Sequence, residues 1–415
     1  MQESLKYDII IESKINYQLN MGFGGALTDA SASLIAKMSD NVKKEFINKV
    51  FSSNYLNYSL IRLTIGSCDF STKTYDYLED GYFNLSHDKE VIIPFLKKIK
   101  KMKQIKLFAS PWSPPAIYKT NGIRQNGGKL KEESYNDYAK YLSTYLNEMK
   151  NNDLAISYMS LQNEPQATQI WDSCIYESSE EARLLSLVYN EIKNSNIDTK
   201  IFIWDHNRDI IFDRVNETLN DNNYNQAYGI AYHWYDNGCS AELSKIHKEY
   251  NDKVMFFTEG CIELLNLDKN NPSSNIGNFE NGLRYCRNYI SDSENYSNAF
   301  IDWNLILDIN GGPNYVGNYC ESPIMYDENN DKLIFNPSFY IISHFSRFIE
   351  NNDIRIDTKI YKENVIATSY KKQNNSIISV ILNDNDYDIN VKISIDKKGY
   401  ILDIPKKSVV TLTVR

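Results

Sequence analysis

The stretch Ser157-Tyr-Met-Ser-Leu-Gln-Asn163-Glu164-Pro165 determines how we interpret the rest of the chain. An apolar, strand-like run ends there in an amide, a carboxylate and a proline, and proline cannot donate to a sheet ladder. We therefore expect the strand to stop with Asn163 and Glu164 at its C-terminal rim. A second such run, Lys253-Val-Met-Phe-Phe-Thr258-Glu259-Gly260, ends in a carboxylate followed by glycine. Most glutamates in a chain of this size are isolated surface acids, but two at matching strand ends predict paired carboxylates that face one pocket.

Strands and helical stretches alternate on both sides of these runs, and their order indicates the fold class. The chain contains eight strand candidates, and the first is a glycine-dense strand near residue 23. The other seven are Tyr58–Gly66, Ile105–Trp112, Ile156–Glu164, Ile201–His206, Ala227–Tyr235, Lys253–Gly260 and Ala299–Leu307. Helix-like stretches separate most of them, for example 30–51, Ser134–Lys150 and Glu180–Ser195. Eight strand–helix units over roughly 330 residues predict an α/β fold, the TIM (β/α)8 barrel.

A doubly wound sheet is the alternative fold. It usually carries a phosphate loop, and the glycines at 22, 24 and 25 do not match GxGxxG, so we reject a dinucleotide site.

The pattern changes after about residue 345, where short stretches alternate apolar and polar residues between Asn/Asp/Lys turns. These strand candidates are Asn364–Tyr370, Ser376–Leu382, Asn390–Ile395 and Ser408–Val414. We expect residues 7–12 to add a strand to them. The predicted domains are therefore a catalytic barrel over residues 20–345 and an accessory antiparallel β domain formed by residues 1–19 and 346–415.

The bulk composition is that of a globular chain and excludes several classes of partner. Of 415 residues, 42% are hydrophobic and 24% charged, and the net charge is −9. A mildly acidic chain suits a phosphate backbone poorly, so we expect no nucleic-acid partner. We find no run of 18 or more apolar residues and expect no integral membrane segment. The start lacks a signal-peptide pattern, which makes a soluble cytoplasmic protein the default expectation; a chain whose signal had been removed would look the same.

Metal and redox chemistry have little support in the sequence. The five histidines show no HExxH, and the acidic run 327–331 lacks the glycine of an EF-hand loop. Six cysteines contain no CxxC pair, which argues against a zinc ribbon or a redox dithiol. We expect no metal and no cofactor.

Polar and aromatic residues also crowd the ends of the other predicted strands, where barrel active sites lie. They are Asp69, Trp112, Asp205, His206, His233, Tyr235, Trp303 and Asn304. His206 and Arg208 are interpreted as structural, with Arg208 pairing Asp209.

Nine segments together resemble glycoside hydrolase family 30, the glucosylceramidase-like enzymes. They follow one order from residue 22 to 314: Gly22-Phe-Gly-Gly-Ala-Leu-Thr-Asp29, Gly66-Ser-Cys-Asp-Phe-Ser71, Ser110-Pro-Trp-Ser-Pro-Pro115, Lys119-Thr-Asn-Gly122, Gln162-Asn-Glu-Pro165, Asp205-His-Asn-Arg-Asp209, Tyr232-His-Trp-Tyr235, Thr258-Glu-Gly260 and Asp302-Trp-Asn304 with Gly311-Gly-Pro-Asn314. Each motif is weak alone, whereas the ordered set is highly specific.

The resemblance implies a (β/α)8 barrel with a β-sandwich built from both termini. It also implies retaining hydrolysis of β-glycosides, with Glu164 as acid/base, Glu259 as nucleophile and a carbohydrate or glycolipid as substrate. By the same match the sugar subsite is lined by Asp69, Trp112, Asn163, His233, Tyr235, Trp303 and Asn318.

The chemistry of a retaining glycosidase sets three expectations. The carboxyl groups of Glu164 and Glu259 should lie ≈ 5–5.5 Å apart. An ionised Glu259 should raise the pKa of Glu164 and keep it protonated. Asp69, as a carboxylate, should accept hydrogen bonds from two sugar hydroxyls and so favour β-D-glucosides.

The leaving group remains open because the chain departs from the mammalian lysosomal pattern after Glu164, where Gln166–Tyr176 is similar to a bacterial branch. A β-xylosidase, β-1,6-glucanase or β-fucosidase, or an idle carbohydrate-binding barrel, are the alternatives. A lipid-facing enzyme would present exposed aromatics at the mouth, for which Phe70–Phe83 is the best candidate.

Overall fold

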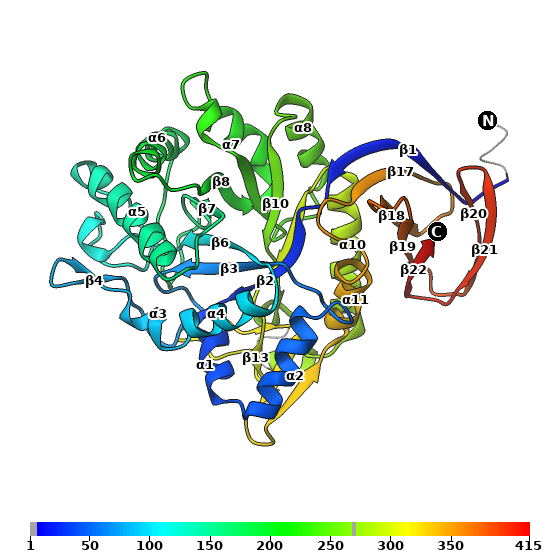
Figure 1. Cartoon of the computed structure of the whole chain (residues 1–415), viewed down its shortest axis with the longest axis horizontal. Coiled ribbons are helices and arrows are strands. Elements are labelled where there is room, and N and C mark those ends of the chain that lie inside the picture. The colour runs from blue at the N-terminus through cyan, green and yellow to red at the C-terminus, as the bar shows by residue number, and fades with distance from the viewer. Residues whose placement is uncertain (1–5, 268–270) are drawn as a thin grey trace.

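Eight parallel strands close into a barrel, which confirms the predicted fold class (Figure 1). The structure is a computed structural model that describes residues 6–267 and 271–415. The barrel strands are β2 (Gly22–Leu27), β3 (Leu60–Ile65), β6 (Lys106–Pro111), β7 (Tyr158–Ser160), β8 (Lys200–Asn207), β9 (Gly229–His233), β10 (Val254–Glu259) and β12 (Ala299–Asp302). All eight predicted strands are present. β7 is shorter than expected, because it ends at Ser160, and Asn163 and Glu164 follow it in a turn.

Helices surround the barrel between successive strands (Figure 1). They are α1 (Asp29–Lys37), α2 (Asp40–Phe51), α3 (Ser86–Glu90), α4 (Ile92–Met102), α5 (Tyr135–Asn151), α6 (Ser178–Asn194), α7 (Ile211–Thr218), α8 (Ala241–Glu249), α9 (Leu264–Leu267), α10 (Phe279–Glu294) and α11 (Pro337–Ser346). The single helix expected over 30–51 is two helices. Met38 is extended, and the Ser39 side chain accepts from the Val42 N–H, which starts α2 anew.

The barrel interior changes from apolar to polar toward the C-terminal ends of its strands. The lower layer is the buried cluster of Leu60, Phe108, Tyr158, Phe202, Ala231, Phe256, Ala299 and Ile301. Inward-facing positions recur every second residue along a strand. Two residues beyond this layer stand Arg62, Ser110, Ser160 and Thr258, all fully buried. We call this second layer, formed by Arg62, Ser110, Ser160 and Thr258, the polar floor; it lies directly under the mouth of the barrel.

A bulge in β8 breaks this alternation at one place. Simple alternation from Phe202 would point Trp204 inward. Trp204 and Asp205 instead have positive φ of 74° and 59°, and the pairing with β9 shifts register there. Asp205 then bonds to inward-facing groups of the floor, while Trp204 packs in the outer core.

A nearly closed β domain follows the barrel and includes the N-terminal strand, as predicted (Figure 1). Its sheet order is β21-β20-β1-β17-β18-β19-β22. The strands are β1 (Ile9–Leu19), β17 (Ile354–Ile360), β18 (Val365–Lys371), β19 (Ile377–Asn383), β20 (Ile389–Ile395), β21 (Lys398–Ile404) and β22 (Ser408–Val414). β17 and β21 were not foreseen.

The two domains share a packed interface, as the alternation along β19 demonstrates. Ile377 and Ile381 face the core of the β domain, whereas Ile378, Val380 and Leu382 belong to the large core of the barrel side. Across this interface, Arg287 of α10 donates two hydrogen bonds to Asp384. They run from Nε to Oδ2 at 2.6 Å and from Nη2 to Oδ1 at 2.8 Å.

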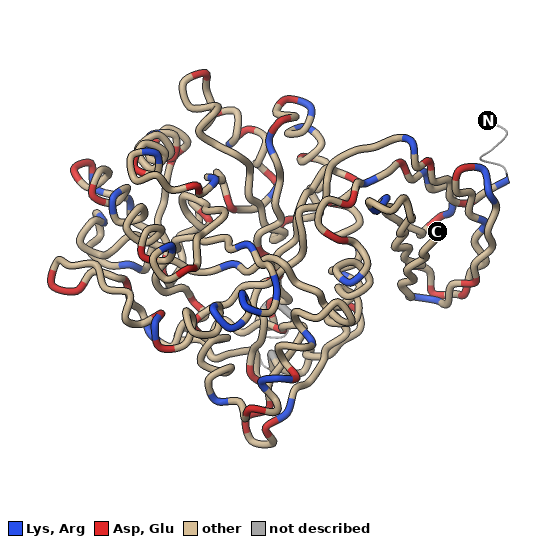
Figure 2. Tube along the Cα trace, viewed as in Figure 1, with Lys and Arg blue, Asp and Glu red and all other residues tan. Residues whose placement is uncertain are grey.

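Short strands form small sheets in the segments that connect the barrel strands and helices. They are β4 (Leu78–Glu79), β5 (Tyr82–Phe83), β11 (Ile262–Glu263), β13 (Leu307–Asp308), β14 (Cys320–Glu321), β15 (Ile324–Asp327) and β16 (Lys332–Phe335). Figure 2 shows basic and acidic residues interspersed along both domains. Among the described residues, no helix is long and apolar enough to cross a membrane.

Candidate active site

A cavity of about 180 Å³ opens among the residues at the C-terminal ends of the barrel strands. Eight of the nine predicted site residues line it: Asp69, Trp112, Asn163, Glu164, Tyr235, Glu259, Trp303 and Asn318. Sequence reasoning did not assign the other lining residues to the site: Gln169, Trp171, His206, Asn207, Cys261, Glu263 and Cys320. His206 and Asn207 end the barrel strand β8, and the other five lie beyond the barrel strands, where no long periodic pattern marks them.

Glu164 is held between two neighbouring strands although β7 has already ended. Its N–H donates to Asp205 O at 2.9 Å, and the Asn163 N–H donates to Pro111 O at 2.8 Å. The Glu164 backbone is left-handed, with φ of 47°. Such a conformation in a residue other than glycine persists where its surroundings enforce it, and it is common at functional sites.

Glu259 ends β10 and its two carboxylate oxygens have different partners. Arg62 Nη1 donates to Oε2 at 2.6 Å, and the Tyr235 hydroxyl donates to Oε1 at 3.1 Å. The residue after Glu259 must be small, because a Cβ at Gly260 would lie 2.4 Å from Phe257 Cζ.

His233 lies between the two glutamates, beneath the cavity, instead of lining it. Its Nδ1 is 3.2 Å from Glu164 Oε1 and 4.0 Å from Glu259 Oε1. Its Nε2 is 3.1 Å from Asp205 Oδ1, and an ionised carboxylate can only accept, so Nε2 carries a proton. His233 is fully buried and contacts the carboxylates, so its place in the sugar subsite stays a prediction.

The protonation of the two glutamates differs from the sequence-based expectation. Burial acts to raise the pKa of Glu164, but His206 and His233 outweigh it and lower that pKa. Burial raises the pKa of Glu259, against the opposing charges of His233 and Arg62. Burial disfavours the charged form of His233, yet Glu259, Asp205 and Glu164 together raise its pKa to about 9. At neutral pH the free site therefore holds a proton on His233 beside Glu164, and not on Glu164 itself.

Arg62 joins the floor of the cavity to both glutamate-bearing segments. Besides Glu259, its Nη2 donates to Asn163 Oδ1 at 2.8 Å and to Asp205 Oδ2 at 2.9 Å. Burial acts against the charge of Asp205, but Arg62 and His233 lower its pKa far below the usual range. Sequence reasoning missed Arg62, although a charged residue inside a fully apolar strand already indicates a buried partner.

Asp69 is a buried acid held by Asn318, whose Nδ2 donates to Oδ2 at 2.9 Å. Burial, with the charge of Glu259 adding to it, raises the pKa of Asp69 to about 8. The expected carboxylate is therefore a neutral acid at pH 7 until hydrogen-bond donors enter the cavity. Beside it Trp112 and Trp303 stack on each other, with ring centroids 5.1 Å apart and planes at 22°.

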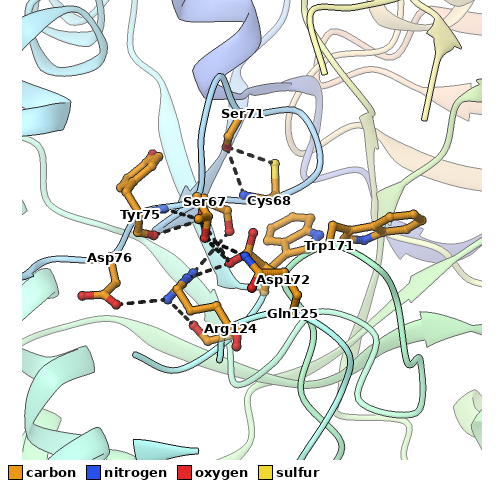
Figure 3. Close-up of polar contacts among 12 residues, drawn as sticks. Ser67, Cys68, Ser71, Tyr75, Asp76, Arg124, Gln125, Trp171 and Asp172 are labelled. Carbon is orange, nitrogen blue, oxygen red and sulfur yellow. Dashed lines mark hydrogen bonds and ion pairs between the residues drawn. The ribbon is translucent and has the colours of Figure 1, made fainter. Parts of the chain in front are cut away.

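A buried ion pair fixes the loops on one side of the cavity (Figure 3). Arg124 Nε donates to Asp172 Oδ1 at 2.7 Å, and Asp172 also accepts from Ser67 Oγ at 3.1 Å and from the Tyr315 hydroxyl at 2.9 Å. Trp171 precedes Asp172 and lines the cavity. The ion pair thus positions an aromatic wall on the loop that follows Glu164.

Two further expectations are wrong. Arg208 pairs with Asp236 at 2.9 Å and Asp292 at 2.6 Å, and not with Asp209. The Phe70–Phe83 loop does not present an aromatic surface, because Phe70 and Tyr77 are fully buried and only Tyr82 is strongly exposed.

One group of side chains that could hold a metal ion lies at the cavity and directly beneath it, within the described ranges. Ligand atoms of Glu164, His206 and His233 all lie within 4.8 Å of one another. Its members come from the ends of three different predicted strands, and their spacing in the sequence matches no metal-ligand motif such as HExxH.

Comparisons with known proteins agree with this geometry. Residues 20–349 match the glycosyl hydrolase family 30 TIM-barrel domain, and residues 354–412 match the glycosyl hydrolase family 30 beta sandwich domain. A TIM barrel with two carboxylates at its mouth, matched in this way over both domains, defines a glycoside hydrolase. The chain belongs to glycosyl hydrolase family 30.

Relatives within the family differ in substrate. Lysosomal acid glucosylceramidase of Mus musculus is 29% identical over 416 residues, 95% of this chain and 80% of the relative. The crystal structure of SrfJ from Salmonella typhimurium has a TM-score of 0.94 at 30% identity and covers 99% of this chain and 93% of SrfJ. The endo-beta1,6-glucanase BT3312 has a TM-score of 0.86 at 26% identity, covering 98% of this chain and 94% of BT3312.

Proposed function

We propose that the chain is a retaining β-glycosidase that prefers β-D-glucosides, with Glu259 as nucleophile and Glu164 as acid/base. One observation carries the proposal: His233 Nδ1 lies within 4.0 Å of carboxylate oxygens of both glutamates. Two carboxylates around one ring nitrogen suit the ≈ 5–5.5 Å separation of retaining enzymes better than the ≈ 6.5–9.5 Å of inverting ones.

In the first step Glu259 attacks the anomeric carbon and the leaving oxygen takes a proton from Glu164. The proton reaches Glu164 from His233 Nδ1 across their 3.2 Å contact once substrate excludes water. In the second step Glu164, now ionised, removes a proton from water, and that water displaces Glu259 from the sugar. Arg62 and Tyr235 stabilise the Glu259 carboxylate when it leaves.

The sugar preference rests on Asp69 and Asn163. Hydroxyls of the sugar that donate to Asp69 favour its ionised form and lower its raised pKa. The Asn163 carbonyl is occupied by Arg62, so its NH₂ group is the part of the amide that serves a sugar hydroxyl. A cavity of about 180 Å³ is small beside the ≈ 300–1,000 Å³ of sites that enclose a drug-sized ligand, which supports a single enclosed sugar residue.

An apolar leaving group is supported by the loops around Trp171. Ile170 beside it is 64% exposed, and Ile117 and Ile123 on the loop after β6 are 68% and 42% exposed. These loops are joined to each other by the hydrogen bond from the Asn126 N–H to Gln169 O, and Gln169 and Trp171 line the cavity, so the exposed isoleucines can offer a surface to an apolar leaving group.

Azide tests the assigned roles. Glu259→Gly with azide should form an α-glycosyl azide, because the anion enters from the vacated face of the nucleophile. Glu164→Ala with azide and an activated nitrophenyl substrate should form the β-azide. Exchange of the two products would reverse the roles, and absence of both would contradict the retaining mechanism.

A β-1,6-glucanase is the second candidate, because the structure of the endo-beta1,6-glucanase BT3312 covers 98% of this chain. β-Xylosidase and β-fucosidase activities are alternatives within the same mechanism. These activities are distinguished by comparing hydrolysis rates on five substrates: nitrophenyl β-glucoside, β-xyloside and β-fucoside, a β-1,6-glucan, and glucosylceramide. A glucan rate above all the others would replace the glucosidase proposal.

A further inference from the structure

Three side chains at the cavity have the chemistry and spacing of a transition-metal site. Glu164 Oε1 lies 3.2 Å from His233 Nδ1 and 3.7 Å from His206 Nδ1. Ligand atoms around a tetrahedral Zn²⁺ with bonds of ≈ 2.0–2.1 Å lie about 3.3 Å apart. The distance from Glu164 to His233 already fits, whereas His206 Nδ1 is about 0.4 Å too far from Glu164 Oε1, so this ring must move closer for all three ligands to bind one metal ion.

His206 offers an unpaired ring nitrogen, and His233 offers Nδ1 once the metal displaces the proton held there. His206 Nδ1 is buried and has no hydrogen-bond partner in the described part of the chain, which is unusual for a buried polar atom. His233 donates through Nε2 to Asp205, which directs the other nitrogen toward Glu164. A histidine held by a carboxylate in this manner is the usual outer support of a metal ligand.

The surrounding charge also favours a cation. Glu164, Asp205 and Glu259 carry carboxylates around the same point, and Arg62 is the cation that pairs with two of them. An additional positive charge beside Glu164 offsets the remaining repulsion. Because Glu164 and His206 line the cavity, water can take the fourth position.

We propose that Glu164, His206 and His233 form a binding site for a divalent transition metal of the zinc class, and that the bound metal inhibits the enzyme. The metal bonds to Glu164 Oε1 and His233 Nδ1, and so occupies the two atoms between which the catalytic proton moves. Two imidazoles and one carboxylate select zinc, cobalt or copper over magnesium and calcium, which prefer oxygen ligands. The site adds reversible control by metal to the proposed glycosidase.

Binding is measured first, without reference to activity. Protein freed of metal by chelation is titrated with Co²⁺ at about pH 8, where protons compete less with the metal. We expect a visible absorption band of a tetrahedral complex that saturates at one equivalent and disappears on addition of Zn²⁺. Mg²⁺ at the same concentration should not displace Co²⁺.

Variants locate the site. His206→Asn and Glu164→Gln should each weaken Co²⁺ binding by about tenfold or more. His247→Gln, which changes a histidine stacked on Tyr296, is the matched control and should bind Co²⁺ as the unchanged protein does. Should His206→Asn fail to fold, Glu164→Gln alone decides the location.

Inhibition is measured second. Zn²⁺ should suppress hydrolysis of nitrophenyl β-glucoside with the affinity found by Co²⁺ competition, and a chelator should restore the rate. Co²⁺ binding that is absent, or unchanged in Glu164→Gln, overturns the proposal whether or not the chain is a glycosidase. Co²⁺ binding without glycosidase activity would instead retain the metal site and overturn the proposed function.

Discussion

Replacement of Arg62 tests the electrostatic structure of the site most directly. Arg62 is fully buried and donates to Glu259, Asp205, Asn163 and, through Nε, to Ser110 Oγ at 3.2 Å. Arg62→Met removes these contacts and leaves two buried carboxylates without their cation. Breaking a buried ion pair by removing one partner costs about 3–5 kcal/mol. We expect the unfolding free energy to fall by about that amount at pH 7.

The pH dependence of the loss follows from Asp205. Its pKa is depressed in the folded state, so its contribution to stability is present above the unfolded pKa and is lost as pH falls. The difference between the unchanged protein and Arg62→Met should therefore be larger at about pH 7 than at about pH 2, which lies below the unfolded pKa of about 3.9. Denaturant unfolding at both pH values measures it.

Arg62→Lys separates charge from geometry. One ammonium keeps the charge but cannot reproduce the planar fork that reaches Glu259 and Asn163 together. We expect kcat/KM to fall about 100-fold, which corresponds to about 2.7 kcal/mol of lost transition-state stabilisation.

The control is Arg183→Met, because Arg183 is 44% exposed and its pairing with Glu132 is worth about 1 kcal/mol at most. If Arg62→Met unfolds like this control, or if Arg62→Lys keeps full kcat/KM, the assigned role of Arg62 is wrong.

Three further predictions address substrate and stability. Asp69→Asn should lower the ratio of kcat/KM for β-glucoside over β-xyloside by about tenfold; an unchanged ratio, or a xyloside preference in the unchanged enzyme, contradicts the role of Asp69. Burial raises the pKa of Asp88 to about 7, so its stabilising protonation is lost as pH rises through that value. Asp88→Asn should accordingly lose less stability between about pH 5 and 9 than the unchanged protein, as thermal unfolding measures. Ile170→Asp should lower kcat/KM for octyl β-glucoside more than for methyl β-glucoside, while Ile401→Asp, 70% exposed on the β domain, should change neither.

The barrel and most of the candidate site were predictable because strand ends carry a strong local signal. An apolar run that stops at Asn163-Glu164-Pro165 or at Glu259-Gly260 indicates both the strand and a candidate residue of the site. Trp171 carries no such signal, and the place of His206 at the end of a predicted strand does not determine whether its side chain lines the cavity. Whether a histidine or tryptophan near a strand end faces the cavity or the core depends on loop packing, here on the Arg124–Asp172 ion pair. The protonation of Glu164 was likewise mispredicted, since it depends on two histidines from other strands.

The β8 bulge explains why local periodicity could not supply the rest. One extra residue at Trp204–Asp205 turns Asp205 toward the floor, where it accepts from Arg62 and contacts His233 Nε2. The backbone carbonyl of the same residue accepts the Glu164 N–H. Asp205 therefore sets the orientation of the His233 ring, the position of the Arg62 cation and the placement of Glu164 together. Regular pairing of β8 would bring Trp204 inward and would leave the charge of Arg62 without one of its two carboxylates. The irregularity in the strand is thus the feature on which the arrangement of both glutamates depends.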